Sequence, residues 1–322
     1  MSSGALESVV GLGGDEVVRL LAQVERRMNE LSAGHGALLA RYAGETIAAG
    51  GKRLRPLLVF LAAGTPPAET DGLLRAAVAV ELVHGATLIH DDVLDGSPLR
   101  RGRPTVFASG GREIATAAGD LLFSRAFAEL ARTGSVEAVR VLSRASSGLA
   151  QGELMQRADA FDVGVGVERY LQRCRLKTAV LFRAACELGS LEAGGPAGVL
   201  GEFGERIGVA FQILDDVLDV TGPPERTGKP RGTDLLDGTV TLPLIVARTR
   251  DPVLAALDAR EVRTPAEAAA VCDRIAATGA LDDARQLALQ QVEQAKRALP
   301  PLSERQRSAL ELVADGVVER YA

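Results

Sequence analysis

The pentapeptide DDVLD occurs twice in the chain, at residues 91–95 and 215–219. Each copy ends a long, mostly apolar stretch with helical spacing, at 70–95 and 197–221. A helix that is apolar around most of its circumference belongs in the interior of a bundle. We therefore expect two interior helices, each of which carries three aspartates at its C-terminal end.

The same helical spacing runs through most of the other residues. Apolar positions recur at 15–33, 36–49, 54–64, 112–132, 135–158, 167–189, 240–249, 265–278, 280–298 and 303–320. Strand-like alternation is nearly absent, and the dominance of Ala and Leu over aromatic residues (3%) favours helix. The run Thr264-Pro265-Ala266-Glu267 predicts a helix start with a capping box. The length of 322 residues suggests two domains, but no linker composition divides the chain. We therefore expect a single all-α domain, a helical bundle over residues 1–322.

Charge and cysteine content exclude several classes of protein. A net charge of −5 makes nucleic acid a poor partner. The N-terminal run MSSGALESVVGLGG lacks the basic and apolar regions of a secretory signal, and no apolar run reaches about 18 residues. Cys174, Cys186 and Cys272 are odd in number and form no CxxC pair, so they indicate reduced thiols. We expect a cytoplasmic protein with at most peripheral membrane contact.

Each DDVLD copy places carboxylates on two sides of its helix. The first and last aspartates are four residues apart and share a face, and the middle one is turned by about 100°. Most charge runs are solvated faces, but Asp is a poor residue inside a helix, and like charges four residues apart repel. Carboxylates without Cys or paired His suit a hard cation, Mg²⁺ before Zn²⁺. The candidate metal ligands are Asp91, Asp92, Asp95, Asp215, Asp216 and Asp219.

Basic residues accompany these carboxylates and indicate a phosphate ligand. Mg²⁺ held by few carboxylates usually completes its coordination with water and substrate phosphates. Arg and Lys bind phosphate oxygens, and a helix start adds its amide donors. The basic residues are Arg100, Arg101 and Arg103 after the first copy, Lys229 and Arg231 after the second, and Lys52, Arg53 and Arg55 in GGKRLRP. Together with the two copies of DDVLD they predict a diphosphate pocket.

The motifs over roughly residues 45–250 resemble those of the trans-isoprenyl diphosphate synthases, or polyprenyl synthetases. The matching stretches are GGKRLRP (50–56), ELVHGATLIHDDVLDGSPLRRGRPT (81–105), GDLLFSRAF (119–127), GELMQ (152–156), KTAVLF (177–182), FQILDDVLD (211–219) and GKPRGTDLLDGTVTLP (228–243). A single DDxxD also occurs in terpene cyclases, but the paired motif with both basic partners is specific.

The resemblance implies a homodimeric helical bundle around a deep central cavity, with the two aspartate clusters facing each other across its mouth. The reaction would be the head-to-tail 1′-4 condensation of isopentenyl diphosphate with an allylic diphosphate such as farnesyl or geranylgeranyl diphosphate. The six aspartates would hold Mg²⁺, three ions in the family, which Mn²⁺ can replace. Arg100, Lys177 and Lys229 would contact the allylic diphosphate. Lys52, Arg55, His84 and Arg101 would hold isopentenyl diphosphate.

The same resemblance assigns roles nearer the reacting atoms. Thr178 and Gln212 would place dipoles beside the allylic cation, and Lys177, Asp91 and Asp215 would act with them in catalysis. His84 could instead be an ordinary core histidine. A lysine common in the family just before TLP is replaced by Thr239, which puts one phosphate contact in doubt. Residues 221–239, rich in Gly and Pro, are either a surface loop or a lid that carries Lys229.

Three hypotheses about the function are compatible with the family resemblance or its motifs. An active synthase needs both aspartate motifs, and both are intact. A non-catalytic subunit of a heterodimeric synthase should have eroded motifs. A terpene cyclase should have an aromatic-rich cavity, which eleven Phe and Tyr residues in the chain argue against.

The positions just before the first DDVLD bear on product length. In the family, bulky aromatics there stop the product at 15 or 20 carbons, whereas this chain has Ala86 and Thr87. We therefore expect a medium or long all-trans product of the kind used for quinone side chains, with geranylgeranyl diphosphate as the alternative. Leu142, or the pair Phe123 and Phe127, is the candidate floor of the cavity, although apolar residues at such spacing are more often ordinary core.

Overall fold

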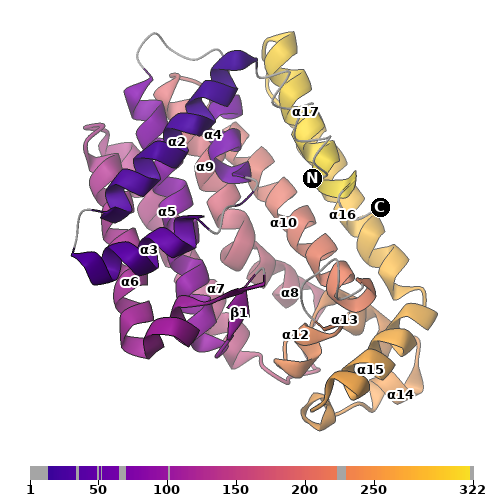
Figure 1. Ribbon diagram of the computed structural model, residues 1–322. Helices are drawn as coiled ribbons and strands as arrows, with labels where there is room; N and C mark the ends of the chain where they lie inside the picture. The colour runs from indigo at the N-terminus through magenta and orange to yellow at the C-terminus, as the bar shows by residue number, and fades with distance from the viewer. Residues whose placement is uncertain are drawn as a thin grey trace.

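The computed structural model describes residues 14–33, 36–48, 51, 53–64, 70–100, 102–222 and 230–319, which are mostly helical (Figure 1). The α-helices are α2 (Asp15–Ala33), α3 (Ala37–Ala48), α4 (Leu54–Ala63), α5 (Asp71–Leu94), α6 (Val106–Ala131), α7 (Val136–Ala158), α8 (Val167–Cys174), α9 (Val180–Glu192), α10 (Ala197–Thr221), α12 (Thr233–Leu236), α13 (Leu242–Arg248), α14 (Pro252–Ala255), α15 (Pro265–Ala277), α16 (Ala280–Arg297) and α17 (Glu304–Glu319). The predicted all-α fold and most predicted helix boundaries are confirmed to within a few residues.

Several local elements differ from the prediction. A π-helical turn, η1 (Arg175–Ala179), joins α8 to α9 where one continuous helix was expected. Helix α6 begins before residue 112, with a kink at Gly111 (φ 80°). Two short antiparallel strands, β1 (Leu99–Arg100) and β2 (Arg103–Pro104), follow the first DDVLD copy. A 3₁₀ turn, η2 (Ala259–Glu261), precedes α15, whose predicted capping box between Thr264 and Glu267 is present.

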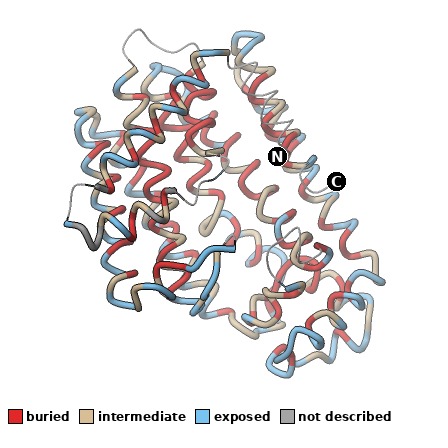
Figure 2. Tube along the Cα trace, in the orientation of Figure 1, coloured by how far each residue is buried: buried red, intermediate tan, exposed pale blue. Residues whose placement is uncertain are grey.

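The two predicted interior helices are α5 and α10. Helix α5 packs against α4, α6 and α9, and α10 packs against α9 and α16. Both are buried along much of their length (Figure 2). By length and composition α5 could cross a membrane, but 61% of its most apolar stretch is buried inside the fold, which is typical of a core helix. The apolar stretches before the aspartates are therefore explained by burial in the bundle.

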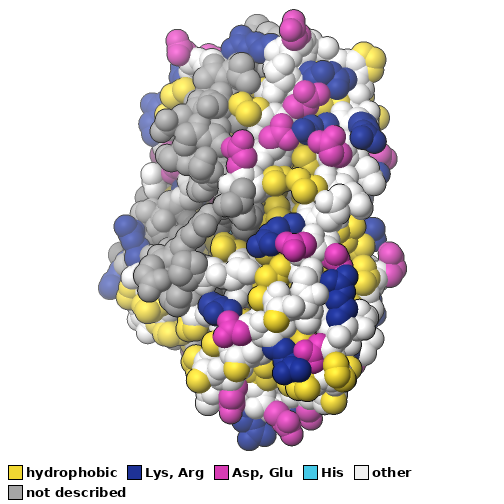
Figure 3. All heavy atoms as spheres, turned by 90° about the vertical axis from the view of Figure 1, so that its right-hand side faces the viewer, with side chains coloured by type: hydrophobic (Ala, Val, Ile, Leu, Met, Phe, Trp, Pro, Cys, Tyr) yellow, Lys and Arg dark blue, Asp and Glu magenta, His cyan; other side chains and the backbone are white. Residues whose placement is uncertain are grey.

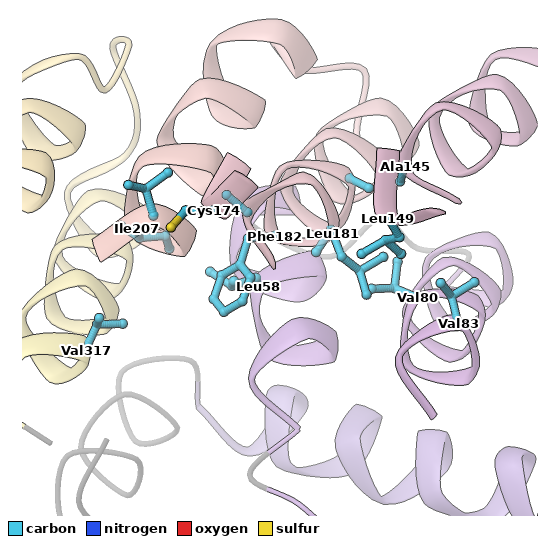
Figure 4. Close-up of a cluster of buried hydrophobic side chains, with 14 of the residues drawn as sticks. Leu58, Val80, Val83, Ala145, Leu149, Cys174, Leu181, Phe182, Ile207 and Val317 are labelled. Carbon is cyan, nitrogen blue, oxygen red and sulfur yellow. The ribbon is translucent and has the colours of Figure 1, made fainter. Parts of the chain in front are cut away.

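The core joins helices that are far apart in sequence. In Figure 4, Leu58 of α4 lies beside Phe182 of α9, and Val80 of α5 lies near Leu149 of α7. Phe182 is 1% exposed and Leu58 fully buried. Burying an apolar side chain of this size stabilises the fold by roughly 1.5–3 kcal/mol. These contacts join α4 to α9 and α5 to α7.

Small residues let η1 approach two helices at close range. A Cβ added at Gly152 of α7 would lie 2.6 Å from the backbone nitrogen of Lys177. A Cβ added at Gly208 of α10 would lie 2.6 Å from the Cα of Ala179. Glycine at both positions therefore allows η1, which carries Lys177 and Thr178, to sit tightly between α7 and α10.

Figure 3 shows the face on the side of α16 and α17. Acidic and basic side chains are interspersed there with hydrophobic ones, and the atoms that are not grey form no patch of a single sign. Pairs such as Lys296 with Asp315 connect α16 to α17 on this side of the molecule. The mixed charges suit a solvated surface rather than a strongly charged docking site.

Candidate active site

Both aspartate clusters line a single cavity of about 1150 Å³. Helix α5 contributes Asp91, Asp92 and Asp95, and helix α10 contributes Asp215, Asp216 and Asp219. The wall also includes Arg55, His84, Arg100, Lys177, Thr178 and Gln212. The structure thus brings together the six predicted metal ligands and the predicted substrate-binding residues that it describes. Lys52, Arg101 and Lys229 lie outside the described residues, as does the part of the predicted lid at 223–229.

The carboxylates of the first cluster have basic neighbours. Asp92 accepts a 2.8 Å hydrogen bond from Nε of Arg100, and Asp95 accepts one from Arg157 of α7. Burial raises the pKa of Asp91 to about 6, although the nearby Lys177 acts to lower it. Burial in a low-dielectric wall destabilises the charged form of the carboxylate. A cation bound beside it would stabilise that charged form.

A chain of hydrogen bonds leads from η1 to the middle aspartate of the second cluster. The Thr178 hydroxyl donates to Gln212 Oε1 (2.6 Å), and Gln212 Nε2 donates to Asp216 Oδ1 (2.7 Å). The hydroxyl of Tyr170 donates to Asp216 Oδ2 (2.7 Å). Burial and the neighbouring Asp234 raise the pKa of Asp216 to about 8. This network orients the Thr178 and Gln212 dipoles, as the predicted stabilisation of a cation requires.

Arg55 is held deep in the wall without a full set of partners. Its guanidinium carbon lies 4.8 Å from the ring centroid of Phe182, and its Nε has no hydrogen-bond partner. Burial lowers the pKa of Arg55 to about 10, against the attraction of Glu81. A buried donor left unpaired is costly, so this position suits an anionic ligand.

Arg53 fixes the start of α4, the helix that carries Arg55. Its backbone is left-handed (φ 46°), a conformation uncommon for a residue other than glycine. The side chain forms ion pairs with Glu25 of α2 and with Glu81 of α5 (2.8 Å). Arg53 was counted among the basic residues of the predicted diphosphate pocket; it lines the cavity, and these carboxylates hold its guanidinium.

Several residues in or behind this wall were not predicted from the sequence; Glu153 lies behind it, since it contacts Lys177 without lining the cavity. Glu153 accepts a 2.7 Å hydrogen bond from Lys177, and Tyr170, Arg173 and Asp234 line the cavity. Two features of the sequence pointed to them. Arg173 lies four residues before Lys177, and Glu153 lies within GELMQ, one of the stretches that resemble the family.

The predicted floor of the cavity is not where it was expected. Leu142, Phe123 and Phe127 are not among the described residues that line the cavity. Leu142 is fully buried in the core, and Phe123 stacks on His90 with ring centroids 5.8 Å apart. Leu122, about 100° round α6 from Phe123, faces the cavity instead.

Of the two small residues before Asp91, only one reaches the cavity. Thr87 lines it, whereas Ala86 is fully buried and does not. Gly85 lies close to Leu122, because a Cβ there would be 3.5 Å from Leu122 Cδ1. Thr87 and Leu122 are therefore among the side chains that shape the wall beneath the first aspartate cluster.

The donor set fits a hard divalent cation. The two clusters supply carboxylate oxygens only, and burial raises the pKa of Asp91 and Asp216. No three Asp, Glu, His or Cys side chains within the described ranges converge as a closed metal site. Open carboxylates of this kind suit a hard divalent cation that keeps water and phosphate oxygens among its ligands.

An all-α bundle in which two helices carry aspartate clusters and basic side chains line the same cavity is typical of the isoprenoid synthase fold. Residues 37–275 match the polyprenyl synthetase family. The chain is 41% identical over 266 residues to heptaprenyl diphosphate synthase component 2 from Geobacillus stearothermophilus (81% of this chain, 83% of the relative). It is 37% identical to geranylgeranyl diphosphate synthase from Methanosarcina mazei (84% and 86% covered).

A solved structure gives the same result. The crystal structure of a polyprenyl synthase from Caulobacter crescentus, complexed with calcium and isoprenyl diphosphate, superimposes with a TM-score of 0.91 at 38% identity and covers 98% of each chain. The chain therefore belongs to the polyprenyl synthetase family, and it is a prenyltransferase.

Proposed function

We propose that the protein is a Mg²⁺-dependent all-trans polyprenyl diphosphate synthase that condenses isopentenyl diphosphate with an allylic diphosphate. The observation that carries the proposal is the single cavity that holds both aspartate clusters together with Arg55, Arg100 and Lys177. The related Caulobacter protein was crystallised with a divalent cation and an isoprenyl diphosphate. The same two kinds of ligand suit the carboxylates and cations of this wall.

The first step is ionisation of the allylic diphosphate. Mg²⁺ held by the two clusters would neutralise charge on the departing diphosphate. Arg100 and Lys177 contribute positive charge on the same wall and stabilise the anion as the carbon–oxygen bond breaks. The hydroxyl oxygen of Thr178, whose proton points to Gln212, can turn its lone pairs to the allylic cation. The surrounding apolar wall excludes water that would quench the cation.

The second step is attack by the double bond of isopentenyl diphosphate on that cation. Arg55 has the unpaired donor and the burial to hold the diphosphate of this substrate, and His84 lines the wall nearby. Lys52 and Arg101 would complete the group. Loss of a proton from C2 of the isopentenyl unit then forms the new double bond, and we assign the departing diphosphate as the proton acceptor. Orientation of both diphosphates by the wall makes the encounter effectively unimolecular.

A medium or long product fits the wall beneath Asp91. The side chain at Thr87 is small, and the aliphatic Leu122 is the bulkier group opposite Gly85. The heptaprenyl relative favours a medium-length product, and the geranylgeranyl relative favours the shorter alternative. We propose farnesyl or geranylgeranyl diphosphate as the primer.

The assembly we propose is a cytoplasmic homodimer. The heptaprenyl relative is named as one component of its synthase. That name raises the alternative that this chain works with a second, different subunit. Activity of the purified chain alone would separate the two.

The test is incubation of the purified protein with Mg²⁺, isopentenyl diphosphate and farnesyl diphosphate, with the products dephosphorylated and identified by mass spectrometry. We expect all-trans products longer than 20 carbons, and no product in excess chelator until Mg²⁺ or Mn²⁺ is restored. A cyclised hydrocarbon, or full turnover in chelator, would contradict the proposal. Activity that appears only on addition of a second polypeptide would favour the heterodimer.

A further inference from the structure

Arg173 is a buried cation that the proposed mechanism does not use. It lies on α8, is 4% exposed, and lines the same cavity as the second aspartate cluster. Its Nη2 donates to the carbonyl oxygen of Val240, and its guanidinium carbon lies 5.6 Å from the ring centroid of Tyr170. Its Nη1 is buried and has no hydrogen-bond partner. A charged donor left unpaired at this depth is costly and therefore calls for a ligand.

The neighbours of Arg173 place it beside the carboxylates of α10. Tyr170, one turn earlier on α8, donates to Asp216. On the other side, Val240 follows Thr239, whose side chain lines the cavity and whose backbone nitrogen donates to the carbonyl of Asp234 (2.7 Å). Arg173 therefore lies between the second aspartate cluster and the segment that enters α13.

The geometry of the guanidinium suits a phosphate oxygen. One nitrogen is anchored on a backbone carbonyl, which fixes the plane of the group, and the other terminal nitrogen is left to donate. Guanidinium groups bind phosphate through such donors, and an anchored side chain loses less freedom when the ligand arrives.

We propose that Arg173 is a diphosphate-binding residue, whose Nη1 donates to a phosphate oxygen of the substrate held at the second aspartate cluster. This inference rests on the proposed function, which places a diphosphate in this cavity. Thr239 stands next to the residue that anchors Arg173, so a lysine at 239 would bring a second cation to the same part of the wall.

The test compares Arg173→Met, Arg173→Gln and the double variant Arg173→Met/Thr239→Lys. The probe is inorganic diphosphate with Mg²⁺, measured by isothermal titration calorimetry, together with KM for farnesyl diphosphate. Loss of a hydrogen bond to a charged group should weaken diphosphate binding about tenfold or more in Arg173→Met. Arg173→Gln keeps a polar donor on a shorter side chain but lacks the charge, so it should bind diphosphate as weakly as Arg173→Met. Thr239→Lys in the Met background should recover a large part of the lost affinity.

Arg175→Met is the matched control, because Arg175 is partly exposed, pairs with the exposed Glu168 and does not line the cavity. Its diphosphate affinity should equal that of the wild type. Unchanged affinity in Arg173→Gln, or weakening in Arg173→Met that Thr239→Lys does not relieve at all, would show that Arg173 only braces Val240 and would overturn the inference. If the wild-type protein binds no diphosphate, both the proposed function and the role of Arg173 are contradicted. If the wild type binds and turns over normally, only the role of Arg173 is at stake.

Discussion

Lys177 of η1 donates a 2.7 Å hydrogen bond to Glu153 of α7. The other oxygen of Glu153 accepts from Arg157 (2.7 Å), which also pairs with Asp95 of the first aspartate cluster. Burial acts to raise the pKa of Glu153, but Lys177 and Arg157 hold it below its ordinary value. Glu153 is therefore ionised at neutral pH and ties the position of Lys177 to α7 and, through Arg157, to α5.

Replacing Glu153 should disturb catalysis without contact with substrate. In Glu153→Ala, Lys177 loses its partner, and displacement of a catalytic cation by about 1 Å can cost about a hundredfold in rate. We expect kcat to fall by about tenfold to a hundredfold. Glu153→Gln keeps an acceptor oxygen for Lys177 and should lose less. Steady-state kinetics with farnesyl diphosphate would measure both.

The matched control is Glu168→Ala. Glu168 also pairs with a basic residue of η1, Arg175, but its side chain is 85% exposed, so the pair contributes little. Its kcat should stay within about twofold of the wild type, since exposed pairs contribute at most about 1 kcal/mol. Equal kcat in Glu153→Ala and the wild type would remove Glu153 from the positioning of Lys177.

Asp91→Asn should abolish turnover and also change how stability depends on pH. Because burial raises the pKa of Asp91 to about 6, its ionised form is disfavoured in the folded, metal-free protein. The stability associated with the protonated carboxyl is present at low pH and is lost as pH rises through about 6. We therefore expect Asp91→Asn to melt at a higher temperature than the wild type at pH 8 in chelator, with a smaller difference at pH 5.

Thermal melts followed by circular dichroism would test this shift, and the helical signal should be the same for both proteins. Asp120→Asn is the control, since Asp120 is a well-exposed residue of α6 that does not line the cavity. Its melting temperature should follow the wild type at both pH values. A Tm difference for Asp91→Asn that is larger at pH 5 than at pH 8 would reverse the predicted sign.

Product length should respond to two of the side chains that line the wall beneath Asp91, Thr87 and Leu122. Thr87→Phe adds bulk that the cavity must accommodate, so we expect shorter products. Leu122→Ala removes a side chain opposite Gly85 and should lengthen them. Mass spectrometry of dephosphorylated products would show both changes.

Ala86→Phe and Leu142→Ala are informative comparisons, because both residues are fully buried outside the cavity. Removing the Leu142 side chain should lower the free energy of unfolding by about 2–5 kcal/mol but leave product length unchanged. A product-length change for Leu142→Ala with none for Leu122→Ala would mean that the cavity floor lies against α7.

The three cysteines should be unreactive in the native protein. Cys174 is 2% exposed, and Cys186 and Cys272 are fully buried. Burial raises the pKa of all three thiols, that of Cys272 to about 12, so the reactive thiolate is scarce at pH 8. An aromatic disulfide reagent should label none of them at pH 8 and all three in guanidinium. Fast labelling of a native thiol would show local opening of the helix that carries it.

The aspartate clusters and their basic neighbours could be predicted from the sequence because they are residue types that recur at short, fixed spacings. Aspartates four residues apart at the end of an apolar helix, with arginines just beyond, specify both the helix and the ligand type. Residues such as Tyr170 and Glu153 could not be found in this way. Each acts through a partner more than twenty positions away, Asp216 and Lys177, and short-range periodicity does not report such contacts.

By itself, the sequence determined the all-α class, the positions of most helices and the residue types of the two aspartate clusters, because helix formation depends on spacing within a few turns. Tertiary structure decided which face of each helix meets the cavity. A rotation of about 100° about the helix axis separates Leu122 from Phe123 and Thr87 from Ala86. The sequence of one helix does not specify how that helix is rotated against its neighbours. Tertiary structure also decided the partners of the arginine side chains in the wall. Arg53 is held by two carboxylates, whereas Arg173 keeps an unpaired donor. Packing between distant segments sets both outcomes, so only the folded chain reveals them.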